Sequence, residues 1–292
     1  MQSFSFQKPV KKASPTPSAS GSQAGEPLVH EDLNYRHPGR QKNAPLITPE
    51  EMEACILEED EDLLVLNKPG WLVCHPSKNG PWSSLVGAVR ELRGLERIHL
   101  VSRLDRETSG LVVLARNHRT ASRLQTAFAK RHTRKRYRAL LAGRLEEERS
   151  TESNLENDPE SPVVVQQRVC FGGRGKAALT RFRPLESWGP HTLVEVEPVT
   201  GRKHQIRVHA AWLEHPILGD KIYGGDPTLY LEFVERGWTE RLEQELRYPR
   251  QALHAHSLEV WGDDFRNQWT APCPFEAEGF KALCQAAERD GA

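Results

Sequence analysis

The chain carries at positions 99–110 the stretch His99-Leu-Val-Ser-Arg103-Leu-Asp105-Arg-Glu-Thr-Ser-Gly110, and the apolar run 111–115 follows it directly. In an extended backbone alternate side chains share a face, so we expect Arg103 and Asp105 to point the same way while Leu104 packs inward. The Thr-Ser-Gly ending predicts a turn, because Gly110 readily takes a positive φ. The stretch therefore indicates a loop that holds one carboxylate between two arginines, immediately before a core strand.

Taken alone, an Arg-x-Asp pair is more often an exposed ion pair worth ~0–1 kcal/mol, with no function. A second segment changes this weighing. It reads Thr200-Gly-Arg-Lys-His-Gln-Ile-Arg-Val-His209 and continues through Pro216 to Gly224. Thr200 is a suitable helix cap and Pro216 ends a helix, so we expect a helix over about 202–214.

Helical spacing divides this second segment into an apolar and a polar face. The apolar face comprises Ile206, Val208 and Trp212, and the polar face comprises Lys203, His204 and Arg207. A face with this much positive charge requires a carboxylate or phosphate groups as partners. An exposed basic helix face without a function stays open as the simpler interpretation.

The two segments together resemble the RluA-type family of RNA pseudouridine synthases. Four motifs of that family occur in order: the strand 64–70 with His75-Pro76, Arg103-Leu-Asp105 with Thr108-Ser-Gly110, Lys135-Arg-Tyr137, and the stretch from Thr200 to Gly224. The similarity spans roughly residues 60–262. One position departs from the pattern, because Ser102 stands where the family usually has histidine.

The resemblance implies an α+β fold, a single catalytic domain with a long bent mixed or antiparallel sheet and flanking helices. It also implies an enzyme that isomerises uridine to pseudouridine at a specific site in structured RNA, either tRNA or rRNA, with base flipping. The reaction breaks the N1–C1′ bond, turns the uracil and rejoins it through C5, without redox change or water. Neither a metal nor a cofactor is therefore expected.

By the same resemblance Asp105 is the catalytic carboxylate, either a nucleophile at C1′ or a base at C2′. A charged carboxylate in a dry pocket costs several kcal/mol without a partner, and the resemblance gives that role to Arg207. Tyr137 would lie against the flipped base, and Arg103 would enter the space that the base vacates. The substrate-binding residues that the resemblance implies are Arg103, Thr108, Lys135, Arg202, His204 and Gln205.

Charge is segregated along the chain although the formal net charge is +0. The segment 97–144 holds thirteen Lys and Arg residues and only two acids, Asp105 and Glu107. A basic stripe beside the proposed pocket predicts RNA as the partner and salt-sensitive binding. The segment 146–160 is acidic in return, with seven acids and one arginine, and we expect it to form an exposed loop or flap.

Composition sets the expected domain organisation. Residues 1–45 are rich in Ser, Pro, Gly, Gln and Lys, which predicts a disordered tail before a catalytic domain over 46–292. The tail lacks the periodic apolar residues of the S4-type RNA-binding module that many larger relatives carry, so no S4 domain is expected. We expect a monomer.

The chain offers few signs of a membrane, a metal site or disulfides. No segment approaches the ~20 apolar residues that cross a bilayer, and no secretory signal is apparent. The five cysteines lack zinc-site spacing, and His254-Ala-His256 is a weak candidate metal pair in a strand. These features favour the cytoplasm.

Periodicity predicts a mixed pattern of elements. Strands are expected at 62–67, 111–115, 135–143, 163–170, 178–184, 191–198 and 253–261, and helices at about 82–93, 118–131, 202–214, 238–247 and 276–288. Two alternatives to the enzyme stay open. A non-catalytic RNA-binding protein of the same fold would not need Asp105, and a nuclease would need clustered carboxylates for Mg²⁺.

Overall fold

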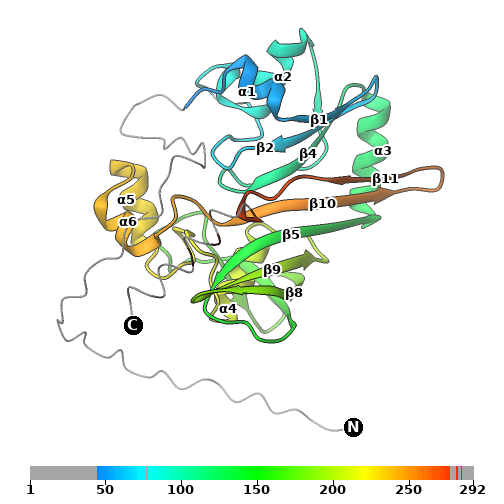
Figure 1. Ribbon diagram of the computed structural model, residues 1–292. Helices are drawn as coiled ribbons and strands as arrows, with labels where there is room; N and C mark the ends of the chain where they lie inside the picture. The colour runs from blue at the N-terminus through cyan, green and yellow to red at the C-terminus, as the bar shows by residue number, and fades with distance from the viewer. Residues whose placement is uncertain (1–44, 77, 277–280, 282–283, 285–292) are drawn as a thin grey trace, which may run out of the picture.

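The computed structural model describes residues 45–76, 78–276, 281 and 284, and its elements are shown in Figure 1. Nearly all of the predicted tail 1–45 and most of the predicted helix 276–288 lie outside the described residues. The proposed boundary between tail and catalytic domain therefore stays a prediction.

One sheet of 11 strands forms the centre of the described chain. The strands are β1 (Ile56–Glu59), β2 (Leu63–Lys68), β3 (His99–Leu100), β4 (Ser109–Ala115), β5 (Thr133–Ala142), β6 (Arg149–Asn157), β7 (Gln167–Cys170), β8 (Lys176–Trp188), β9 (His191–Pro198), β10 (Leu253–Trp261) and β11 (Arg266–Thr270). The α-helices are α1 (Pro49–Ala54), α2 (Leu85–Arg93), α3 (His118–Ala129), α4 (Gln205–Trp212), α5 (Thr228–Arg236) and α6 (Glu240–Leu246). Short 3-10 turns lie at Pro81–Ser83 and Pro274–Glu276.

The strand order is β1-β2-β4-β10-β5-β9-β8-β6-β7, with β3 beside β4 and β11 beside β10. Every pair is antiparallel except β4 with β10, which run parallel. Register shifts interrupt β10 against β5 and β8 against β9, and such bulges bend a sheet. The bend is visible along β5 in Figure 1. The predicted α+β fold with a long mixed sheet is confirmed.

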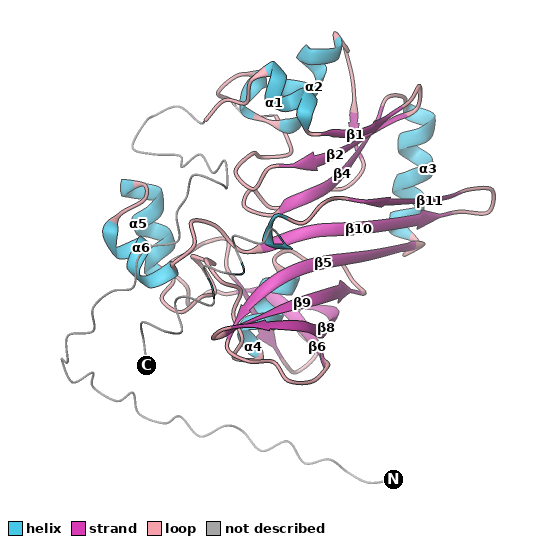
Figure 2. Cartoon of the chain, viewed as in Figure 1, coloured by secondary structure: helices cyan, strands magenta, loops and turns pink. Residues whose placement is uncertain are grey.

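Helices cover both faces of the β2–β4 part of the sheet (Figure 2). Leu63 and Val65 pack in a cluster that includes α3, whereas Leu64 and Leu66 pack in one that includes α1 and α2. Strands buried on both faces read as continuous apolar runs, which explains the run 111–115. Helix α4 packs on the other half of the sheet, against β7, β8 and β9.

Helix α4 is shorter than predicted. It begins at Gln205, and the Thr200 hydroxyl bonds to the Gln205 side chain at 2.6 Å instead of capping the helix. Ile206 and Ala210, four residues apart, form its stripe toward the main core. Trp212 lies off that stripe and is 51% exposed, so its predicted place in the core is wrong.

The acidic segment 146–160 is not a loop, because most of it is β6, paired with both β7 and β8. Thr151 and Leu155 are buried while the charged residues around them face outward. Arg168 on β7 lies against three acids of this segment and forms ion pairs with Glu156, Asp158 and Glu160. Hydrophobic alternation did not reveal this strand, because its two buried residues are four positions apart and acidic residues lie around them.

Six of the seven predicted strands are found with bounds within a few residues, and the seventh, 163–170, shrinks to β7. The predicted helices at 82–93, 118–131 and 238–247 correspond to α2, α3 and α6. The sequence analysis missed α1, α5, β1, β3, β6 and β11. Most of these are short elements that flank the core, where hydrophobic periodicity has little length in which to show itself.

Gly110 lies opposite Ala255 in the parallel contact between β4 and β10, and its φ is the positive value expected, 107°. The predicted turn at Thr108-Ser-Gly110 is wrong, because β4 already begins at Ser109. A Cβ at this position would lie 2.3 Å from the carbonyl oxygen of Ala255. We expect Gly110→Ala to lower the free energy of unfolding by about 3 kcal/mol or more, from overpacking and backbone strain together. Thermal unfolding measures this.

The matched control is Gly94→Ala, because Gly94 also has a positive φ, 59°, but nothing lies within 4 Å of the added Cβ. It should cost only about 1–2 kcal/mol, the backbone penalty by itself. Equal losses in the two variants would contradict the close approach of β4 to β10.

Candidate active site

Asp105 lies in the loop between β3 and β4, and one buried lysine, Lys68, holds this loop from one side. The fully buried Lys68 ammonium donates to the Arg106 carbonyl oxygen at 2.9 Å. Its other two bonds go to the carbonyl oxygens of Pro69 and Leu72. Burial lowers the pKa of Lys68 to about 8. This lysine acts as a tether between the end of β2 and the residue that follows Asp105.

Two further segments hold the same loop from the other side. Lys221, between α4 and α5, forms an ion pair with Glu107 at 2.7 Å. Just before β10, the Arg250 guanidinium donates to the Glu107 carbonyl oxygen at 3.2 Å, and the Gln251 amide donates to the Thr108 hydroxyl at 2.5 Å. The position of Asp105 is thus fixed by neighbours on three distant segments of the chain.

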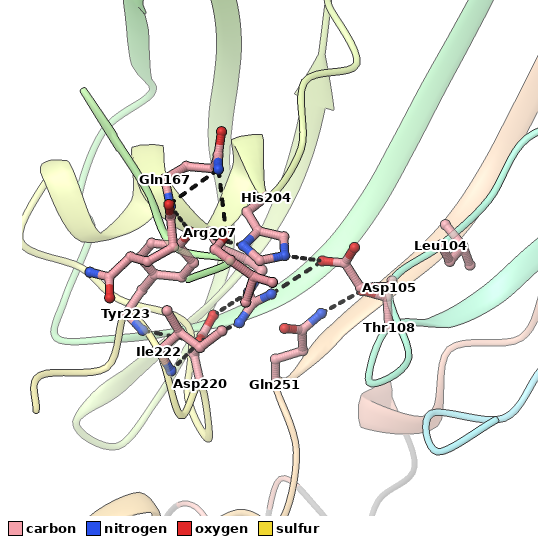
Figure 3. A network of polar contacts seen from close by, with 12 residues as sticks. Leu104, Asp105, Thr108, Gln167, His204, Arg207, Asp220, Ile222, Tyr223 and Gln251 are labelled. Atoms are coloured by element: carbon pink, nitrogen blue, oxygen red, sulfur yellow. Dashed lines mark hydrogen bonds and ion pairs between the residues drawn. The ribbon is translucent and has the colours of Figure 1, made fainter. Parts of the chain in front are cut away.

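Arg207 on α4 meets Asp105 across the cleft between the two halves of the sheet (Figure 3). Its Nη1 donates to Asp105 Oδ2 at 3.2 Å. The rest of the guanidinium is engaged by Asp220, with Nε to Oδ2 at 2.6 Å and Nη2 to Oδ1 at 2.8 Å. The structure brings together the pair that the sequence predicted, and it adds a second carboxylate that the sequence analysis did not assign.

The charges in this triad support one another. Burial opposes ionisation of Asp220, but the Arg207 charge and the backbone N–H groups of Ile222 and Tyr223 hold the pKa of Asp220 below its usual range. Burial also opposes the Arg207 charge, and Asp220 and Asp105 raise the pKa of Arg207. The guanidinium therefore stays charged, and the two-point contact with Asp220 fixes its orientation toward Asp105.

His204 stands next to this triad at the start of α4. Its Nε2 lies 3.8 Å from Asp105 Oδ2, and its Nδ1 lies 2.9 Å from the Tyr223 hydroxyl. Burial, helped by the nearby Arg207 charge, lowers the pKa of His204 to about 4. The imidazole is consequently neutral at pH 7.

Tyr137 on β5 forms part of the cleft wall. It packs against the main core beside α4 and against the cluster that includes α3. Burial, with a contribution from Asp105, raises its pKa, so the phenol stays protonated. The cleft has a volume of about 560 Å³. All nine residues that the sequence singled out line it.

Four cations at the cleft lack a carboxylate partner anywhere in the described part of the chain: Arg103, Arg131, Lys135 and Arg202. Burial lowers the pKa of Lys135. On the same basic strand as Lys135, Arg138 forms an ion pair with Glu195 at 2.6 Å. The four cleft cations are placed to meet an anion that enters the cleft.

Two of the predicted substrate contacts are occupied within the protein. The Gln205 side chain accepts from Thr200 and the Arg202 N–H, and donates to Leu179 and Thr180, which uses its full capacity. The Thr108 hydroxyl accepts from Gln251. In this structure both side chains line the cleft while their hydrogen bonds are made within the protein.

Several residues of the site received no role from the sequence: Lys68, Asp220, Lys221, Tyr223 and Gln251. Four of them lie inside the motifs 64–70 and 200–224, so the sequence pointed to these segments but not to the residues that each side chain contacts. Gln251 lies outside every motif. Its contact with Thr108 joins residues 143 positions apart, which sequence pattern does not reveal.

Among the described residues, no group of three or more His, Cys, Asp or Glu side chains is arranged to hold a metal ion. His254 is buried, bonds through Nδ1 to the Ser109 hydroxyl at 3.0 Å, and has a pKa lowered by burial to about 3. The part of the chain that the structure describes contains no helix long and apolar enough to span a membrane. All five cysteines are unpaired.

Asp220→Asn is expected to lower the free energy of unfolding by about 3–5 kcal/mol, because it leaves the Arg207 charge buried with half its partners. Asp220 has a lowered pKa in the folded state, so its stabilisation is complete above the unfolded pKa of about 4 and is lost as the pH falls further. The difference between the two proteins should therefore be largest near pH 7 in urea unfolding.

Asp226→Asn is the control, because Asp226 pairs with Arg241 on the surface with 45% of its side chain exposed. It should change stability little at any pH. A loss for Asp220→Asn no greater than for this control would show that the buried pair does not hold Arg207.

Comparison with known proteins places these features in a family. The family model described as RNA pseudouridylate synthase matches residues 62–212. A protein of Xylella fastidiosa named ribosomal large subunit pseudouridine synthase D is 37% identical over 216 residues, covering 72% of this chain and 62% of that protein. The protein of the same name from Xanthomonas campestris is 35% identical, covering 84% and 72%.

Solved structures agree. The human RNA pseudouridylate synthase domain containing 4 superposes with a TM-score of 0.62 at 26% identity, covering 82% of this chain and 95% of that one. The chain spans about three fifths of the length of the Xylella relative. The predicted resemblance, fold class and enzyme class are confirmed, and the chain belongs to the RNA pseudouridylate synthase family.

Proposed function

We propose that this chain isomerises a specific uridine of large-subunit ribosomal RNA to pseudouridine, with Asp105 as the catalytic carboxylate. The observation that carries the proposal is the Asp105–Arg207–Asp220 arrangement inside a cleft with unpaired cations. The names of the bacterial relatives favour ribosomal RNA over tRNA as the substrate. The proposed enzyme is a cytoplasmic monomer that uses neither a metal nor a cofactor.

The chemistry requires an ionised carboxylate beside the ribose. The N1–C1′ bond breaks, the uracil turns, a C5–C1′ bond forms, N1 gains a proton and C5 loses one, so the atoms balance without a co-reactant. Asp105 serves either as nucleophile at C1′ or as base at C2′, and both routes need its negative charge. Arg207 supplies the opposite charge, and Asp220 keeps that charge in place.

The cleft is suited to a nucleotide removed from its helix. A stacked nucleotide does not present its sugar to a pocket, so the uridine has to be flipped out. Tyr137 gives the flipped base a flat wall, and Arg103 at the rim is placed to enter the vacated space. Arg131, Lys135 and Arg202 are then positioned to meet phosphates. His204, Gln205 and Thr108 complete the proposed pocket around the substrate.

The alternatives are less well supported. A non-catalytic RNA-binding surface gains nothing from a carboxylate at the base of its cleft, because that charge repels phosphates. A metal-dependent nuclease needs clustered carboxylates, and the described residues offer no such cluster.

Asp105→Asn is expected to reduce the single-turnover rate of pseudouridine formation by at least about 10³-fold, because the amide neither attacks C1′ nor removes a proton. RNA affinity, measured by filter binding, should stay within a few-fold, since Asp105 makes no contact with phosphate in this account. EDTA should leave the wild-type rate unchanged.

Asp263→Asn provides the control, because Asp263 is an exposed residue in the turn between β10 and β11, outside this cleft. Its rate should equal that of the wild type. Pseudouridine formation by Asp105→Asn at the rate of this control would refute the proposed catalytic role.

The double substitution Arg131→Gln with Arg202→Gln should weaken RNA binding and reduce its salt dependence. Each lost phosphate contact lowers the slope of log K against log salt by about 0.7–0.9. Arg236→Gln, on the exposed face of α5, is the control and should leave the slope unchanged. Slopes that do not differ between the two proteins would exclude this cleft rim as the phosphate contact.

A further inference from the structure

The Tyr223 hydroxyl makes two hydrogen bonds to the described residues. It accepts from the backbone N–H of Gln167 at 2.8 Å and lies 2.9 Å from Nδ1 of His204 (Figure 3). A backbone N–H only donates, and a phenol has a single proton to give. The phenol oxygen is able to accept two hydrogen bonds, but the described residues offer its proton no acceptor other than Nδ1 of His204, so the phenol donates to that nitrogen.

This direction fixes the tautomer of His204. A neutral imidazole whose Nδ1 accepts carries its proton on Nε2, the nitrogen that faces Asp105 Oδ2 at 3.8 Å. The opposite tautomer would aim the Nε2 lone pair at a carboxylate and leave the phenol proton without an acceptor. The polar contacts on both sides of the ring thus select the same form.

The backbone and the packing hold the ring where this donor is useful. His204 has a φ of 54°, a conformation that residues other than glycine keep only where the surroundings enforce it. Its side chain is 9% exposed, and the ring meets the Tyr223 ring edge-on at 5.7 Å. Arg207 lies over the same tyrosine ring, 5.0 Å from its centre.

We propose that His204 is a positioning residue for Asp105, with its Nε2–H as the second donor to Oδ2 and with Tyr223 setting the tautomer. Arg207 donates to the same oxygen. Oδ1 has no partner among the described residues, so the two donors on Oδ2 leave Oδ1 available to the ribose. Donors in active sites often lie too far for a hydrogen bond in the free enzyme and tighten around the substrate, and we expect the 3.8 Å gap to close in this way.

This role differs from the substrate contact that the resemblance implied for His204. Its catalytic consequence rests on the proposed function, but the tautomer itself does not.

The tautomer is measured without RNA. Long-range ¹H–¹⁵N NMR of the full chain, labelled at histidine, distinguishes protonated from unprotonated ring nitrogens, and the His204 signals are those missing in His204→Gln. At pH 7 we expect a proton on Nε2 alone. Tyr223→Phe should abolish this pattern and give a mixture of tautomers.

Tyr230→Phe is the matched control, because Tyr230 packs in the same apolar cluster as Tyr223 and lies outside the proposed machinery. It should leave the His204 signals unchanged. A proton on Nδ1 in the wild type, or an unchanged pattern in Tyr223→Phe, would overturn the proposal.

Kinetics test the role of the donor through two substitutions of His204. Glutamine places an N–H donor where Nε2 stands, whereas asparagine reaches only to the Nδ1 position. We expect His204→Asn to lose about 10²-fold in kcat, with KM nearly unchanged, and His204→Gln to lose at most about tenfold. Asparagine tolerates a positive φ better than glutamine, so a purely structural role would give the reverse order.

The possible failures are distinguishable. If all variants and the wild type fail to form pseudouridine, the proposed function falls, while the NMR result still decides the tautomer. If the wild type is active and the two His204 variants lose kcat equally, the positioning role is refuted.

Discussion

The site depends on one guanidinium shared between two carboxylates. Arg207 is nearly fully buried, and such a charge is tolerated only with close and well-oriented partners. Asp220 supplies two contacts that fix the plane of the guanidinium, and the remaining Nη1 then points to Asp105. Asp105, with 38% of its side chain exposed, is thereby held in position at a surface that a substrate reaches.

The sheet explains why the two charges meet. Asp105 precedes β4 on one half of the sheet, whereas Arg207 lies on α4, which packs on the other half. Strand β10 joins the halves, because it pairs with β4 on one side and with β5 on the other. The cations that hold the Asp105 loop come from β2, from the segment between α4 and α5, and from the segment before β10, so the loop is tied to both sides of this junction.

Sequence predicted the parts of the molecule in which a local pattern and the chemistry coincide. The apolar run 111–115 predicted its strand, Gly110 has the expected positive φ although it lies in β4 and not in a turn, and the motifs gave Asp105 and Arg207 as neighbours. It failed where tertiary contacts decide: β6 is a strand because β7 and β8 pair with it on both sides, and Trp212 is exposed because α4 faces the core with Ile206 and Ala210. Asp220 lies within a motif that the sequence revealed, but only the fold shows that it binds Arg207.

The central claim is that Arg207 acts through its charge and its fixed orientation and not by binding RNA. The most direct test is to measure the single-turnover rate and the RNA dissociation constant of Arg207→Lys together. Lysine keeps the charge but is unable to hold Asp220 at two points and reach Asp105 at once. We expect a rate at least about 10²-fold lower, with affinity within a few-fold of the wild type. A rate near that of the wild type, or an affinity that falls as far as the rate, would contradict it.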